Sequence, residues 1–153
     1  GKYSGVDSLP GGIEPTFVPG RNILFLTVAA NRAAAGGALN LVTGVCEEDF
    51  GGYPDCRREF IDSMETALSL GITGKSGHFK IHTPLMSLSK KQSVQLAMEL
   101  PGCMEALAYS HTCYDGQVPP CGKCHACLLR ARGFDEAGVP DPLIERCKEL
   151  SGD

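Results

Sequence analysis

The chain has 153 residues, a formal net charge of −4 and 42% hydrophobic residues. This length is enough for one domain with a sizeable core, and the mildly acidic balance argues against a protein that binds nucleic acid through a basic surface. No apolar run approaches the roughly 20 residues of a membrane span, and the polar, glycine-rich start of the chain does not have the pattern of a signal peptide.

Eight cysteines could form four disulfides in a secreted scaffold. Four of them, however, fall within fifteen residues, and the chain is too long and too helical in pattern to need such cross-links. A reducing, cytoplasmic environment is the better interpretation.

Residues 1–22 are rich in glycine and proline and show no periodicity. A complete domain seldom begins with such a loop, so we expect an interior loop of a longer domain whose upstream part is missing. The stretch 23–35 is almost entirely apolar and predicts a buried helix, with Asn22 as its N-cap and Gly36 as its end.

A run with β-branched residues at 39–45 predicts a buried strand, and a polar loop follows it. The next helix shows one apolar face at Phe60, Ile61 and Met64, with Asp55 as the expected N-cap and Gly71 as the expected end. Alternation at 78–82 predicts a short second strand. Strands separated by helices imply a parallel sheet, and two strands are too few for a stable one.

The C-terminal part begins with a capping-box sequence at 89–92, which predicts a helix. A short apolar segment follows at 103–109. Further helices are expected from Cys127 to Phe134 and over 143–150.

Four cysteines with the spacing C-x7-C-x2-C-x2-C are the strongest single signal: Cys113, Cys121, Cys124 and Cys127. Two-residue gaps let neighbouring thiolates converge on one ion. Four thiolates fill a tetrahedral Zn²⁺ site and leave no open position, so this pattern predicts one structural zinc.

The polar loop 46–57 follows the first strand, and ligands of parallel sheets bind outside the carboxyl ends of strands. Its candidate ligand-binding residues are Glu47, Asp49, Tyr53, Asp55 and Arg57. The alternative is a solvated loop in which Asp55 is only a cap. Arg21 and Asn22, at a helix start, could bind a phosphate, or could form an ordinary helix start.

Together these residues resemble one family, the 7-cyano-7-deazaguanine synthases of the queuosine pathway, within the PP-loop ATP pyrophosphatase superfamily. The blocks that carry the resemblance are residues 16–22, 43–60, 83–86, 112–114, 121–127 and 130–134. They cover the chain from about residue 13 to its end.

The resemblance implies an enzyme, a C–N bond-forming ligase, that converts 7-carboxy-7-deazaguanine and ammonia to 7-cyano-7-deazaguanine with ATP and Mg²⁺. It implies a Rossmann-like parallel sheet with flanking helices, here partial, over 1–110 and a four-cysteine zinc module with C-terminal helices over 111–153. It also implies a cytoplasmic homodimer without direct nucleic-acid or membrane contacts. Arg21 and Asn22 would lie near the nucleotide, and the residues of loop 46–57 would line the deazaguanine pocket.

The family's phosphate loop, Ser-Gly-Gly-x-Asp-Ser, does not occur in this sequence. We therefore expect the chain to be inactive alone. Two other interpretations stay open: a catalytically dead paralogue that acts as a zinc-stabilised binding or structural module, and a nucleic-acid-binding zinc ribbon, against which the negative charge argues.

Overall fold

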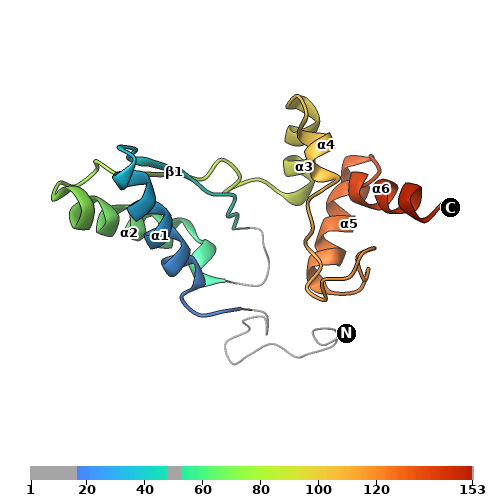
Figure 1. Cartoon of the computed structure of the whole chain (residues 1–153), viewed down its shortest axis with the longest axis horizontal. Coiled ribbons are helices and arrows are strands. Elements are labelled where there is room, and N and C mark those ends of the chain that lie inside the picture. Colours follow the sequence, from blue (N-terminus) through green and yellow to red (C-terminus); the bar gives the residue numbers. More distant parts are fainter. Residues whose placement is uncertain (1–16, 48–52, 153) are drawn as a thin grey trace. The chain divides into compact units, whose positions relative to one another are not determined.

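The structure, a computed structural model, describes residues 17–47 and 53–152. These residues form two compact units, 17–87 and 88–152 (Figure 1). The first contains a small parallel sheet with helices, which confirms a mixed α/β class. The second is helical apart from its loops. The predicted functional division into residues 1–110 and 111–153 stays a prediction. No helix in the described ranges has the length and apolar character that a membrane crossing requires.

Residues 17–87 carry a strand–helix–strand unit. The elements in chain order are α1 (Arg21–Ala35), β1 (Asn40–Val42), the 3₁₀ turn η1 (Pro54–Cys56), α2 (Arg58–Leu68), the π-helical turn η2 (Ser69–Thr73) and β2 (Lys80–His82). The two strands are parallel, with Leu41 opposite Ile81. The predicted parallel pair joined by a helix is therefore confirmed, although both strands are shorter than expected.

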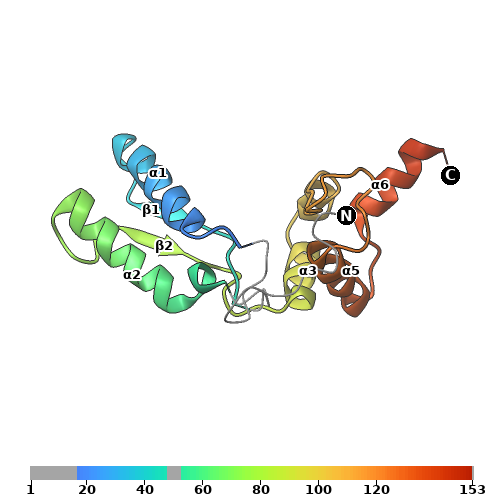
Figure 2. The same ribbon diagram turned by 90° about the horizontal axis from the view of Figure 1, so that it is seen from below.

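One face of this sheet carries the core. Ile81 packs with Leu26 and Ala30 of α1 and with Ile61 and Leu68 of α2. Figures 1 and 2 show α1 and α2 on the same side of the strands. The side chains that alternate with these, on the opposite face, are exposed in both strands. The described sheet is thus covered on one face only, whereas parallel sheets usually carry helices on both.

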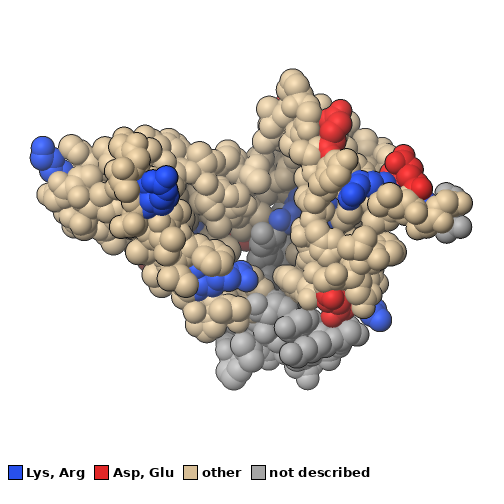
Figure 3. Space-filling model, viewed as in Figure 1, with Lys and Arg blue, Asp and Glu red and all other residues tan. Residues whose placement is uncertain are grey.

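Helix α1 differs from the prediction in two ways. It is buried on one face only: Leu24, Phe25 and Val28 are each 60% exposed, whereas Leu26 and Ala30 are buried. Much of the surface of this part of the chain is uncharged in Figure 3. The N-cap of α1 is Gly20, at φ 74°, instead of Asn22. A positive φ suits glycine because it has no Cβ to clash, so the helix starts two residues before the predicted position.

Helix α2 also departs from the prediction at both ends. Asp55 is not its N-cap; that position belongs to Arg57, whose side chain makes no capping bond. Gly71 does not end it, because the chain continues into η2 and turns at Gly74, at φ 68°. A π-helical turn lengthens the hydrogen-bond spacing by one residue, and here it extends the helical path past Gly71, which the sequence pattern predicted as the end.

Residues 88–152 form α3 (Lys90–Glu99), α4 (Cys103–Leu107), α5 (His125–Ala137) and α6 (Pro142–Ser151). The capping box of α3 is confirmed: Gln92 N donates to Ser89 Oγ at 3.1 Å and Ser89 N donates to Gln92 Oε1 at 2.8 Å. Helix α3 packs closely on α5 at Gly133, where an added Cβ would lie 2.9 Å from the Cβ of Lys90. Only glycine allows this approach.

Arg130 joins three elements of this unit. Its guanidinium donates to both carboxylate oxygens of Asp141 at 2.5 and 2.8 Å, and to the carbonyls of Leu107 and Ser110 at 3.1 and 3.2 Å. Both side chains of the ion pair are largely buried. Asp141 is also the N-cap of α6, accepting from Leu143 N at 2.9 Å. This network fixes α4, α5 and α6 against one another.

Candidate functional site

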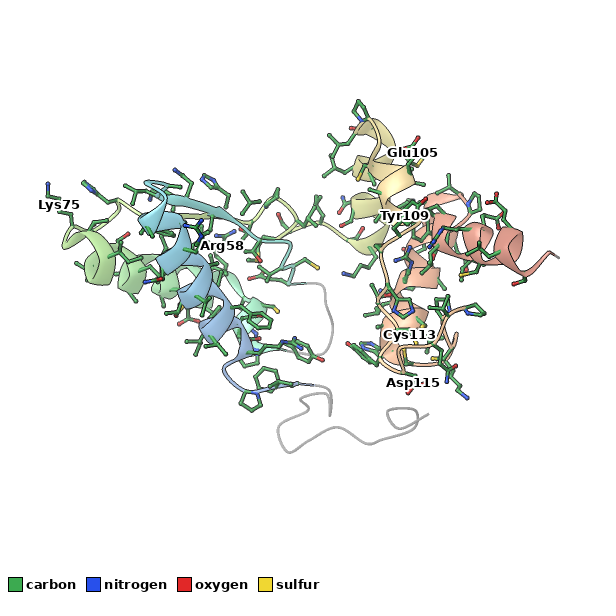
Figure 4. All side chains as sticks on the ribbon, in the orientation of Figure 1. Arg58, Lys75, Glu105, Tyr109, Cys113 and Asp115 are labelled. Atoms are coloured by element: carbon green, nitrogen blue, oxygen red, sulfur yellow. The ribbon has the colours of Figure 1, made fainter. Side chains whose placement is uncertain are left out.

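The four predicted metal-ligating cysteines come together. The sulfur atoms of Cys113, Cys121, Cys124 and Cys127 all lie within 4.8 Å of one another. A Zn–S bond of about 2.3 Å in a tetrahedron requires sulfurs about 3.8 Å apart, and Cys121 Sγ lies 3.9 Å from Cys127 Sγ. The donor set therefore fits a tetrahedral metal ion. Cys113 belongs to the loop before α5, labelled in Figure 4.

Backbone groups prepare these thiols to act as ligands. Cys121 N donates to Cys113 Sγ and Cys124 N donates to Cys121 Sγ, both at 3.4 Å. The first of these bonds helps to lower the pKa of Cys113 to about 6, whereas burial raises the pKa of Cys127 to about 12. Four thiolates cannot coexist so closely without a cation, and a bound ion would offset their repulsion.

The second candidate region brings the helix start and the polar loop together. Asn22 N donates to Asp55 Oδ2 at 3.2 Å, and Asn22 Nδ2 donates to the Asp55 carbonyl at 3.0 Å. Asp55 is 6% exposed. Its carboxylate thus caps α1, from 33 residues further along the chain, at the positive end of the helix dipole. The backbone N–H of Asn22, one of the two candidate phosphate-binding residues, therefore donates to a carboxylate of the chain itself.

Glu47 has a similar position at the start of α2. Its Oε1 accepts from Arg58 N, the first residue of α2, at 2.8 Å. Glu47 N donates to the Met86 carbonyl at 3.0 Å, which ties the loop after β1 to the loop after β2. The Arg58 guanidinium, labelled in Figure 4, donates to Thr83 Oγ1. Arg58 therefore connects the carboxyl ends of both strands.

An open hollow of about 620 Å³ lies beside this junction. It is lined by Glu47, Arg57 and five residues of α2: Arg58, Glu59, Asp62, Ser63 and Thr66. Carboxylates can accept hydrogen bonds from a ring N–H edge, and guanidinium groups can hold a carboxylate or phosphate. The volume lies within the usual range of small-molecule sites, about 300–1,000 Å³.

The structure places the predicted site residues at several different positions instead of in one group. Asn22 meets Asp55, and Glu47 and Arg57 share the hollow. Tyr53 packs instead on Phe17, with ring centroids 5.3 Å apart. Arg21 is half-buried and has no ion-pair partner among the described residues. Asp49 lies outside the described residues.

Sequence reasoning missed Arg58, although it stands next to a residue that was selected. The available signal was its position at a predicted helix start, after the polar loop that follows the first strand. The contact between them joins residues 25 apart, which sequence spacing does not reveal.

The comparisons with known proteins decide the family. The model of the family described as queuosine biosynthesis protein QueC matches residues 5–138, most of the chain. The chain belongs to the QueC family.

Curated relatives of this QueC chain carry the name 7-cyano-7-deazaguanine synthase. The one from Gloeobacter violaceus is 56% identical over 151 residues, which cover 97% of this chain and 64% of that protein. The one from Chromobacterium violaceum is 56% identical over 142 residues, covering 93% and 57%. The one from Leptospira biflexa is 44% identical over 137 residues, covering 86% and 54%. The chain thus spans less than two thirds of these relatives.

Proposed function

We propose that this chain is part of an enzyme that makes 7-cyano-7-deazaguanine from 7-carboxy-7-deazaguanine and ammonia, with ATP and Mg²⁺ as the activating pair. The observation that carries the proposal is its membership of the QueC family, with 56% identity to a named synthase over 97% of the chain. The nucleotide-binding domain would be Rossmann-like. A cytoplasmic location and a homodimer remain predictions of the same resemblance.

The reaction requires the substrate carboxylate to be activated, because a carboxylate oxygen is a poor leaving group. ATP would supply the phosphate-bearing group, ammonia would then form an amide, and a second activation and dehydration would give the nitrile. The described chain contributes side chains that can position the substrate. Arg57 and Arg58 can bind its carboxylate, and Glu47 can accept from the N–H edge of the base.

Asp55 and Asn22 have a different role in this proposal. Their mutual hydrogen bonds join the loop to the start of α1, so they would position the pocket wall. Tyr53, two residues before Asp55 in the chain, packs on Phe17 and would contribute to the same wall. Arg21 and Asp49 remain proposed contacts to nucleotide and substrate, respectively.

The cysteine cluster would hold one zinc ion with a structural role. Four sulfur ligands leave no coordination position for substrate or water. When bound, the ion supplies a cross-link between the loop carrying Cys113 and the start of α5, where Cys127 lies. The side chains proposed to handle substrate belong to the other unit of the chain.

Titration calorimetry with 7-carboxy-7-deazaguanine tests the pocket. We expect Arg57→Ala to weaken binding at least about tenfold, because a charge-assisted hydrogen bond is lost. Arg32→Ala is the matched control: it removes an exposed arginine that does not line the hollow and should leave binding unchanged. If the folded, zinc-loaded chain does not bind the substrate, the alternative of a zinc-stabilised structural module is favoured.

A further inference from the structure

Arg130 uses its whole guanidinium group for contacts inside the second unit. Nε and Nη2 donate to the two carboxylate oxygens of Asp141, at 2.5 and 2.8 Å. Nη1 donates to the Ser110 carbonyl at 3.2 Å and to Ser110 Oγ at 2.8 Å, and Nη2 also donates to the Leu107 carbonyl at 3.1 Å. A guanidinium has five N–H groups, so these contacts, the Arg130 clamp, use all of its donors.

The Arg130 clamp attaches the segment that leads to Cys113 to helix α5. Ser110 precedes Cys113 by three residues, and this stretch has no helix or strand of its own. Three extended residues span at most about 10–11 Å, so Cys113 cannot lie farther than that from the anchored Ser110. Arg130 stands three residues after Cys127 in α5, which is about 4.5 Å along the helix axis. The clamp therefore keeps Cys113 close to the other cysteines of the cluster.

Cys113 is the ligand that most requires such an anchor. Cys121, Cys124 and Cys127 follow one another at two-residue gaps, and Cys124 is the N-cap of α5. Seven residues separate Cys113 from Cys121, a connection that could extend to about 28 Å. The four sulfurs, however, lie within 4.8 Å of one another. The hydrogen bond from Gly116 N to the Cys113 carbonyl, at 3.1 Å, shapes this loop but does not attach it to α5.

The clamp consists of charges that offset one another away from water. The side chains of Arg130 and Asp141 are 12% and 10% exposed. Asp141 also accepts from Leu143 N at the start of α6, and Arg130 Cζ lies 5.5 Å from the centroid of the Phe134 ring. Another geometry would leave buried polar groups without partners, which costs free energy. The clamp can therefore hold its position before a metal ion binds.

We propose that Arg130 is a positioning residue for the four-cysteine metal site. The clamp holds Cys113 against the start of α5, so the fourth thiolate is in place when a tetrahedral, thiolate-binding cation such as Zn²⁺ arrives. The five hydrogen bonds of Arg130 go to oxygen atoms and not to sulfur, so its effect on metal affinity passes through Cys113. The inference rests on the proposed metal site and does not depend on the proposed reaction.

Competition with a chromophoric zinc chelator measures the affinity of the whole chain for Zn²⁺. Arg130→Lys keeps the positive charge of the buried pair, but an ammonium group has three donors on one nitrogen and cannot span Asp141 and both carbonyls. This variant should bind Zn²⁺ at least about tenfold more weakly, as is usual when a group that orients a metal ligand is changed. Arg132→Lys is the matched control: Arg132 lies two residues further along α5, is 47% exposed, and should not affect binding.

A double-mutant cycle separates positioning from general stabilisation. Cys113→Ala removes the ligand through which Arg130 is proposed to act. Adding Arg130→Lys to that variant should lower the remaining affinity by less than about twofold, because no fourth thiolate is left to position. Co²⁺ in place of Zn²⁺ gives a second readout. Its thiolate-to-metal absorption per bound ion should fall in Arg130→Lys towards the value of Cys113→Ala, since fewer thiolates coordinate the ion.

Three results would overturn the proposal. One is an unchanged Zn²⁺ affinity in folded Arg130→Lys. The second is an equal loss of affinity with and without the Cys113 thiol, since Arg130 would then only stabilise the helices. The third is failure of the unaltered chain to bind either Zn²⁺ or Co²⁺. That result would also contradict the proposed metal site, but it would leave the proposed reaction untouched.

Ser110→Ala decides the matter if Arg130→Lys does not fold. This variant removes one of the five hydrogen bonds of the clamp and keeps the ion pair. It should speed the transfer of Zn²⁺ to the chelator at least about threefold, because the segment before Cys113 is held less firmly. A transfer rate equal to that of the unaltered chain would show that the clamp does not position Cys113.

Discussion

The Asn22–Asp55 contact gives a prediction that can be worked out from the structure. Asp55→Ala removes a carboxylate that accepts from the backbone of α1 at 3.2 Å and that is 6% exposed. Loss of a side-chain cap costs about 1 kcal/mol, and loss of a partly buried charge at a helix N-terminus costs about 0.3–2 kcal/mol. Because the hydrogen bond from Asn22 N to Asp55 is long, we expect Asp55→Ala to lower the free energy of unfolding by about 1.5–2 kcal/mol in total.

Two related variants separate the contributions to this change in the free energy of unfolding. Asp55→Asn keeps the shape and one acceptor oxygen but removes the charge, and should cost about half as much. Asn22→Ala removes the donor to the Asp55 carbonyl at 3.0 Å but keeps the backbone bond, and should cost about 1 kcal/mol. Asp62→Ala is the control, since Asp62 is exposed and its ion pair with Arg58 is weak at 3.5 Å.

Urea unfolding followed by circular dichroism measures these costs on zinc-loaded protein, with hydrogen exchange to assign them to α1. The chain consists of two compact units, so a single transition must be established first. The amide of Asn22 should lose protection in Asp55→Ala. If Asp55→Ala costs no more than Asp62→Ala and the Asn22 amide exchanges at its original rate, the carboxylate does not cap α1 and the reasoning fails.

Three further predictions concern the metal cluster, the sheet edge and the packing of α5. Cys113→Ser should lower zinc content, measured by elemental analysis, and the thermal midpoint, whereas Cys103→Ser, outside the cluster, should change neither. Burial alone would raise the pKa of Glu65, but bonds from the Ile81 backbone and Lys80 more than offset this and lower it. Glu65→Gln should therefore lower the free energy of unfolding, with the full loss above the unfolded-state pKa of about 4.3. The difference in free energy between the two proteins should vanish as the pH falls below the folded-state pKa of Glu65. A difference that does not depend on pH would contradict this. Gly133→Ala should cost about 1–3 kcal/mol by overpacking, and Gly71→Ala, with open space around it, should cost much less.

Local patterns allowed several features to be predicted from the sequence. The capping box at Ser89 depends on residues three apart, and the cysteine cluster on short spacings, so both follow from the sequence alone. The two strands and their helical crossover follow from hydrophobic periodicity. These predictions succeeded because the groups that interact are close in the chain or repeat with a regular period.

Contacts between distant residues explain what was missed. Asp55 was assigned as a cap because it precedes a helix, and it does cap a helix, but α1 rather than α2. Glu65 accepts a hydrogen bond from the backbone N–H of Ile81 in β2, which is 16 residues further along the chain. No local sequence pattern indicates this contact. The apolar sequence of α1 predicted burial. Composition shows that the side chains of α1 favour burial, but it does not show which elements will pack against them. Only one face of α1 packs on the described sheet.

Nitrile formation tests the central claim most directly. A chimera is made by joining this chain to the part of the Gloeobacter violaceus synthase that it does not match, in the order in which that relative carries it. The chimera is incubated with 7-carboxy-7-deazaguanine, ammonia, ATP and Mg²⁺, and 7-cyano-7-deazaguanine is measured by mass spectrometry. We predict product from the chimera, a loss of most of it in Arg57→Ala, and none from the chain alone. A folded, zinc-loaded chimera that binds substrate but forms no nitrile would contradict the proposed function. Turnover by the chain alone would contradict its dependence on the part of the relatives that it does not match.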